Sequence, residues 1–207
     1  MAQKEHIIRA ASEMFATYGI KAVRMDDIAH ELGVSKRTLY ELFGDKEELL
    51  YEAMMELFIR KHSEHTAIAA KAENILEAMF MVLNEIMQEA PLHERLTANL
   101  RRFYPKVFER VKSEGIEHHN RGLRHLIDRG IEQGFFVEWM NIELTISVFC
   151  AAARSLKGKD EQISVPEGMS ERETFTQLVT TLFRGIATEK GRELIDRYAG
   201  EYLAEKR

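Results

Sequence analysis

The sequence predicts an all-α protein built of two domains. Apolar residues recur every three or four positions along most of the chain, which is the spacing of one buried helix face. No segment shows the alternation of apolar and polar residues that is typical of a strand. Only three prolines occur, Pro91, Pro105 and Pro166, so long helices meet few interruptions.

The composition narrows the class of protein. Of the 207 residues, 45% are hydrophobic and 30% are charged, which indicates a folded chain rather than a disordered one. We find no signal segment and no apolar run that could cross a bilayer, so we expect a cytoplasmic protein without a membrane partner. A single cysteine, Cys150, predicts no disulfide framework. The net charge of −5 weighs mildly against a nucleic-acid binder, although phosphate binding depends on where the cations lie.

A helix-turn-helix is predicted near the N terminus, after a first helix over residues 3–18. Residues 26–32 form the next helix, and Gly33 ends it because glycine enters the left-handed conformation without steric cost. Ser35 can then cap a third helix over residues 36–43. Two short helices around a tight glycine turn can place the second of them in the major groove of DNA.

A longer, position-specific pattern spans the same segment. It consists of Ile28-Ala29, Gly33-Val34-Ser35, Thr38-Leu39-Tyr40, Phe43 and Lys46-Glu47-Glu48-Leu49-Leu50. This pattern resembles the TetR/AcrR family of one-component transcriptional regulators. The resemblance implies a helix-turn-helix DNA-binding domain over residues 1–46 and a helical effector-binding and dimerisation domain over residues 47–207. It also implies a homodimer that binds a double-stranded DNA operator.

The predicted recognition helix carries most of the expected DNA contacts. Lys36 and Arg37 can reach guanine O6 and N7, because long cationic side chains bond base edges in the major groove. By resemblance, Thr38 and Tyr40 contact phosphate or bases, and Lys46 is a free phosphate anchor at a helix start. For the two recognition-helix cations the alternative is a solvated helix face, and for Tyr40 it is packing against the first helix. The full expected DNA-binding set is Arg24, Ser35, Lys36, Arg37, Thr38, Tyr40 and Lys46; Glu41 adds an acid beside it.

The rest of the chain is predicted to be a series of helices. Pro91 is expected to separate two of them, and a polar loop is expected over residues 157–170. The predicted helices cover residues 46–70, 74–90, 92–103, 105–133, 141–156, 171–189 and 192–206.

Two of these helices predict a subunit interface. Residues 142–156 are apolar on nearly every face, and the helix from Glu171 carries a second apolar stripe. By resemblance, both helices pair with their symmetry mates in a four-helix bundle; the alternative is a buried helix at the centre of a monomer. The expected interface residues are Ile146, Phe149, Ala153, Phe175, Leu178, Val179, Leu182 and Phe183.

An effector cavity is expected among the helices of residues 47–207, because regulators of the family that this sequence resembles bind small, often hydrophobic molecules there. Plain hydrophobic core is the alternative for each candidate. The candidate lining residues are Phe80, Leu83, Met87, Phe103, Tyr104, Val107 and Phe108. The clustered histidines fit solvated helix faces better than a metal site, so no metal and no cofactor are expected. These histidines are His62, His65, His118, His119 and His125.

Together these observations predict a ligand-responsive transcriptional regulator, a repressor that a small molecule of unknown identity releases from its operator. An enzyme is not expected, because no glycine-rich phosphate loop, nucleophile elbow or HExxH zinc motif occurs. The alternative is a DNA-tethered adaptor, or a DNA-binding protein that spreads along the duplex without a small-molecule effector.

Overall fold

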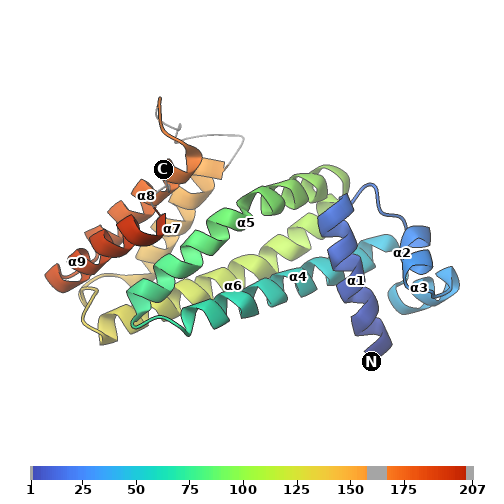
Figure 1. The fold of residues 1–207 in the computed structure, drawn as a ribbon, viewed down its shortest axis with the longest axis horizontal. Helices are drawn as coiled ribbons and strands as arrows, with labels where there is room; N and C mark the ends of the chain where they lie inside the picture. Colours follow the sequence, from blue (N-terminus) through green and yellow to red (C-terminus); the bar gives the residue numbers. More distant parts are fainter. Residues whose placement is uncertain (1, 158–166, 204–207) are drawn as a thin grey trace. The chain divides into compact units, whose positions relative to one another are not determined.

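The computed structural model describes residues 2–157 and 167–203, and these residues form nine α-helices and a short C-terminal π-helix (Figure 1). The predicted all-α class is therefore confirmed. The chain divides into two compact units: an N-terminal unit of residues 1–64 and 89–117, and a C-terminal unit of residues 65–88 and 118–207. Within the described ranges, no helix is both long enough and apolar enough to cross a membrane.

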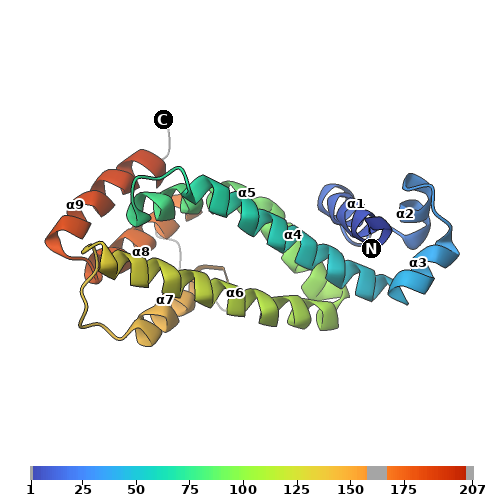
Figure 2. The same ribbon diagram turned by 90° about the horizontal axis from the view of Figure 1, so that it is seen from below.

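The N-terminal unit contains three short helices, α1 (Ala2–Tyr18), α2 (Met25–Glu31) and α3 (Lys36–Phe43), which lie close together in Figures 1 and 2. It also contains most of α4 (Lys46–Ala69), the end of α5 (Ile75–Phe103) and the first half of α6 (Pro105–Glu132). All six helices contribute to one core. Its members include Phe15, Ile28, Leu39, Leu49, Leu50, Leu96, Leu100 and Val107.

This shared core bears on the expected division between residues 46 and 47. The short helices bury their apolar faces against α4 and against residues of α5 and α6. The N-terminal compact unit therefore includes residues 47–64 and 89–117, which belong to the predicted second domain. The functional division at residue 46 stays a prediction.

The C-terminal unit contains α7 (Ile142–Lys157), α8 (Glu171–Gly185), α9 (Glu189–Tyr198) and the π-helix η1 (Ala199–Leu203). Aromatic rings fill its core. The ring of Phe183 stacks on that of Phe136 with centroids 5.8 Å apart and meets the tilted ring of Phe149 at 4.4 Å. Leu76, Phe80 and Ile195 are also fully buried in this core.

The predicted break at Pro91 is wrong, because α5 continues through this residue from Ile75 to Phe103. A proline inside a helix removes one backbone hydrogen bond and costs about 3 kcal/mol. Leu96 and Leu100 lie beyond the proline and are buried in the core, and their burial offsets that cost.

The predicted boundary between the last two helices is also wrong. Helix α8 ends at Gly185 and α9 begins at Glu189, because the connecting residues leave the helical conformation. Ile186 accepts a backbone hydrogen bond from Val137 at 2.9 Å, and the N–H of Thr188 donates to Phe135 at 2.9 Å. Thr188 then caps α9 by accepting from the N–H of Gly191. Most of the predicted 157–170 loop and the end of the predicted last helix lie outside the described residues.

Candidate nucleic-acid interface

The turn between α2 and α3 is held by backbone and hydroxyl hydrogen bonds. Gly33 has a φ of 62°, in the left-handed region, and the N–H of Val34 donates to the carbonyl of Ala29 at 3.0 Å. The Ser35 hydroxyl accepts from the N–H of Thr38 at 3.0 Å and so caps α3. The predicted glycine turn and serine cap are therefore confirmed.

Helix α3 buries one face and exposes the other. Leu39 is fully buried and Phe43 is nearly so, which fixes the helix against the core. On the opposite face, the side chains of Lys36 and Arg37 are 54% and 87% exposed, and Tyr40 is 43% exposed. Tyr40 is thus not buried against the first helix, and the outer face of α3 is accessible to a duplex.

Both exposed cations of α3 form ion pairs within the chain. The Lys36 ammonium lies 2.7 Å from a carboxylate oxygen of Asp26, and Arg37 Nε lies 2.7 Å from Glu41. The hydrogen bond that Lys36 donates to Asp26, followed by the negative charge of that carboxylate, raises the pKa of Lys36 above its usual value. Both pairs are exposed, where ion pairs contribute little, and phosphates or base edges can replace the carboxylates at small cost.

The start of α2 presents a third cation. Arg24 is exposed and immediately precedes the helix. Its backbone N–H donates to the Asp27 carboxylate at 2.7 Å, so an acid on the helix supplies the cap that arginine cannot.

Lys46 occupies a different environment from the one expected. Its ammonium is half-buried and donates to the carbonyls of Ile20, at 2.8 Å, and Val23, at 2.5 Å. It also lies 5.8 Å from the ring centroid of Phe15 and 5.4 Å from that of Tyr104. The lysine therefore ties the α1–α2 link to the start of α4, rather than projecting freely into solvent.

The comparisons with known proteins agree with this geometry. Residues 7–53, which contain the helix-turn-helix, match the family described as bacterial regulatory proteins, tetR family. This segment is therefore a DNA-binding domain of the TetR family. Regulators of this family bind DNA operators, typically as dimers, and are not enzymes. The prediction of a DNA-binding transcriptional regulator is therefore confirmed.

Similarity to known regulators extends well beyond the DNA-binding segment. The HTH-type transcriptional repressor KstR2 of Mycobacterium tuberculosis is 24% identical over 153 residues, 69% of this chain and 73% of that protein. The Bacillus subtilis HTH-type transcriptional regulator YhgD is 29% identical over 138 residues, 64% of this chain and 69% of the relative. The structure of the fatty acid degradation regulator FadR from Bacillus halodurans has the same fold, with a TM-score of 0.58 at 18% identity over 100% of this chain and 97% of FadR.

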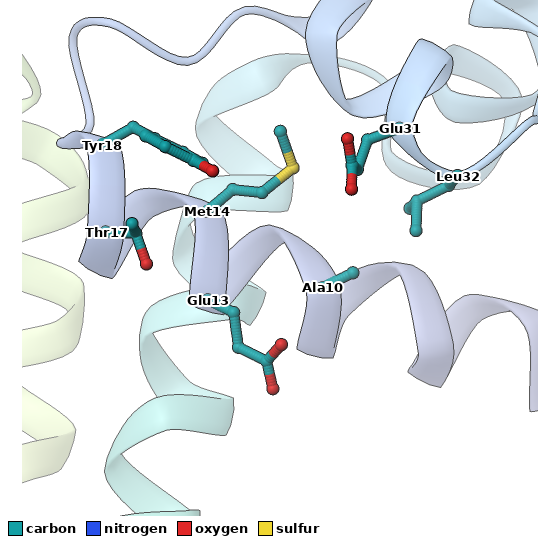
Figure 3. Close-up of a pocket in the computed structure, with 7 residues that line it drawn as sticks. All are labelled: Ala10, Glu13, Met14, Thr17, Tyr18, Glu31 and Leu32. Atoms are coloured by element: carbon teal, nitrogen blue, oxygen red, sulfur yellow. The ribbon is translucent and has the colours of Figure 1, made fainter.

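Acidic side chains also lie beside the helix-turn-helix. A shallow hollow of about 280 Å³ lies between α1 and α2. Figure 3 shows Tyr18 and Glu31 on either side of Met14, with Glu13 further along α1. Two carboxylates at this hollow would repel phosphate, so the hollow is not expected to contact the duplex.

The residues expected to line an effector cavity are divided between the two cores. Phe80, Leu83 and Met87 belong to the core of the C-terminal unit. Tyr104, Val107 and Phe108 belong to the core of the N-terminal unit, while Phe103 is 37% exposed. Phe80 and Val107 are fully buried, as the hydrophobic-core alternative requires. An effector role for the seven stays a prediction.

Several residues expected at a dimer interface are used within the protomer. Ile146, Val179 and Phe183 are buried, and Phe149 and Phe175 pack against the core of the C-terminal unit. Leu178 and Leu182 are half-buried, and the side chain of Ala153 lies outside the described residues. Helix α8 therefore directs much of its apolar stripe inward.

Other apolar residues around α7 are exposed, although they are not in the expected interface set. Leu144 is 63% exposed, Val148 is 44% exposed, and Trp139, just before the helix, is 83% exposed. The signal was present in the sequence, since Leu144 and Val148 are four residues apart and Trp139 is the one tryptophan of the chain. Among the described side chains, no three histidines, cysteines or acids gather as a metal site; those of His118 and His119 are not described.

Replacing Glu41 by glutamine is expected to tighten DNA binding. The change frees Arg37 from its partner and removes a negative charge beside the exposed face of α3, so affinity should rise about two- to five-fold. Fluorescence anisotropy with a labelled duplex measures the change. The matched control is Glu13→Gln, which breaks the exposed Arg9–Glu13 pair of the same spacing on α1 and should leave affinity unchanged. Equal effects of the two substitutions would contradict a specific role for Glu41.

Proposed function

We propose that this protein is a ligand-responsive repressor that acts in the cytoplasm and binds a pseudo-palindromic operator through residues 1–46. The observation that carries the proposal is the exposed face of α3, where Lys36, Arg37 and Tyr40 project from a helix fixed by Leu39 and Phe43. A helix presented in this way can enter the major groove, with its cations at base edges. Arg24, Ser35 and Thr38 would contact the phosphates nearby.

The repressor and ligand assignments draw on relatives of the chain. KstR2 is a transcriptional repressor and a ketosteroid transcriptional regulator. FadR is a regulator of fatty acid degradation, and a Saccharomonospora viridis regulator of similar fold was solved with choline. We infer that a small molecule also controls DNA binding by this chain. A hydrophobic molecule would suit the many apolar side chains of residues 47–207. A coupling of about 1–3 kcal/mol between ligand and DNA suffices to change occupancy ten-fold.

The N-terminal unit offers a physical route for this coupling. The guanidinium of Arg110 on α6 bonds the Glu48 carboxylate in the first turn of α4, at 2.7 Å and 3.3 Å, and lowers the pKa of Glu48. The same guanidinium lies 3.7 Å from the ring centroid of Tyr51, whose hydroxyl donates to Glu114. A ligand-induced shift of α6 would thus move the start of α4, to which the helix-turn-helix is attached.

Dimerisation completes the proposal. Two recognition helices must sit about 34–36 Å apart, one helical turn, to engage successive major grooves. We propose that α7 and α8 pair with their symmetry mates. Leu144 and Val148 would contribute the outward apolar surface, with Trp139 at its edge, because exposed apolar side chains of this size are stabilised by a partner.

The test is selection of duplexes from a random library by the purified protein at low salt. We expect a palindromic consensus with half-sites about one helical turn apart. Failure to select any sequence would count decisively against the proposal. Lys36→Ala should then cost about 1–3 kcal/mol and relax the preference at one position of each half-site. Lys112→Ala, which removes an exposed lysine paired with Glu109 on α6, is the control and should retain the full preference.

A further inference from the structure

A group of cations lies on the elbow between α5 and α6 and on the neighbouring α1–α2 link. Lys21, Arg101, Arg102 and Lys106 are all exposed. None of them forms an ion pair with a carboxylate among the residues that the structure describes. We refer to these four residues as the elbow cations. Most other lysines and arginines of the N-terminal unit, such as Lys4, Lys61 and Arg110, are paired with an acid.

Three of the elbow cations lie over aromatic rings, and two of them share one ring. The Lys21 ammonium lies 4.8 Å from the ring centroid of Phe103, and the Arg102 guanidinium lies 5.1 Å from the same centroid. Arg101 lies 5.2 Å from the ring centroid of Phe108. Two positive charges that share one exposed ring repel each other, so this arrangement favours an anionic partner.

The position of the group within the N-terminal unit identifies that partner. Lys21 and Arg24 belong to the same short link between α1 and α2, and three residues span at most about 11 Å. Arg95 on α5 donates to the carbonyl of Ala16 near the end of α1, and Lys46 joins the link to Tyr104 in the elbow. The elbow is therefore attached to the link that carries Arg24, a proposed phosphate contact.

We propose that the elbow cations bind phosphates of the duplex that flanks each operator half-site. This inference rests on the proposed operator binding and extends it beyond the three short helices. The four cations are exposed and spread over α5, α6 and the α1–α2 link, which suits an extended polyanion better than a small anion that needs converging donors. Contacts of this kind add affinity without sequence preference, because phosphates carry no base information.

The experiment compares two lengths of one selected duplex. The short form contains only the selected bases, and the long form adds about 10 base pairs, one helical turn, on each side, in two unrelated flanking sequences. For the wild-type protein we expect the long form to bind about ten-fold more tightly whichever flank is used. For Arg102→Gln with Lys106→Gln we expect equal affinity for both lengths. The slope of log affinity against log salt should become smaller in magnitude by about two to four, because fewer phosphates are neutralised.

Two further variants make the result specific. Arg121→Gln with Arg192→Gln removes two exposed cations of the C-terminal unit that form no ion pair with a described side chain, and should keep the gain from the flanks. Arg102→Lys with Lys106→Arg preserves the charge and should also keep it. The inference is overturned if the wild-type protein binds both lengths alike, or if the control pair loses the gain as fully as the elbow pair. Selection of no duplex at all would overturn the proposed function as well.

Discussion

Replacing Gly191 by alanine is expected to lower the free energy of unfolding by about 3 kcal/mol. A methyl group on Gly191 would lie 2.1 Å from the carbonyl oxygen of Phe135 and 3.2 Å from the Cβ of Ala187. That oxygen is already held by Thr188, whose N–H donates to it at 2.9 Å. Because the clash is with backbone, α9 would have to move away from the segment on which it packs.

Urea denaturation followed by circular dichroism measures this effect. The control is Gly115→Ala in α6, where a methyl group would meet nothing within 4 Å. That substitution should stabilise the protein by about 0.5–1 kcal/mol, because alanine favours the helix over glycine. Unfolding free energies that are equal for Gly191→Ala and the wild type would show that α9 does not approach Phe135 as closely as described.

Replacing Lys46 by methionine is expected to lower the free energy of unfolding by about 2 kcal/mol. Methionine keeps the length of the side chain but leaves the carbonyls of Ile20 and Val23 without their donor. The α1–α2 link would lose its attachment to α4, so DNA affinity should fall as well. Thermal unfolding and duplex binding, measured on the same preparation, report the two effects.

The matched comparison is Lys36→Met, which removes an exposed lysine from α3. It should lower DNA affinity and leave the unfolding free energy almost unchanged. A phosphate anchor at Lys46 would give a different pattern, with unchanged stability and a salt slope that is smaller by about one per contact. That pattern would refute the structural role assigned here to Lys46.

The helix-turn-helix could be predicted almost residue by residue. Gly33, Ser35 and the 36–43 helix follow from interactions within a few positions: a left-handed glycine, a hydroxyl cap and apolar residues at helical spacing. The exposed face of α3 follows from the same spacing, because burial of Leu39 and Phe43 turns Lys36 and Arg37 outward. The match of residues 7–53 to the TetR family confirms that this local pattern is specific.

The helices after residue 46 were predicted less well, because where they end and what they bury depend on residues far away in the sequence. Pro91 predicts a break on local grounds, yet α5 continues where its later residues are buried. Similarly, α8 ends early because residues 135–137 pair with the segment after it. Val179 and Phe183 were predicted to contact a second subunit, but they are buried in the core of their own protomer.

The sequence by itself determined the helical class, the family and the recognition helix, since caps, glycine turns and helical periodicity act within one or two turns of the chain. Only the tertiary structure decided which apolar faces remain exposed, where Lys46 directs its ammonium and which cations lack an acidic partner. Those properties depend on residues far apart in sequence, such as Lys46 with Ile20 and Lys21 with Phe103. Burial and charge pairing arise between elements, so the pattern of any single segment leaves them open.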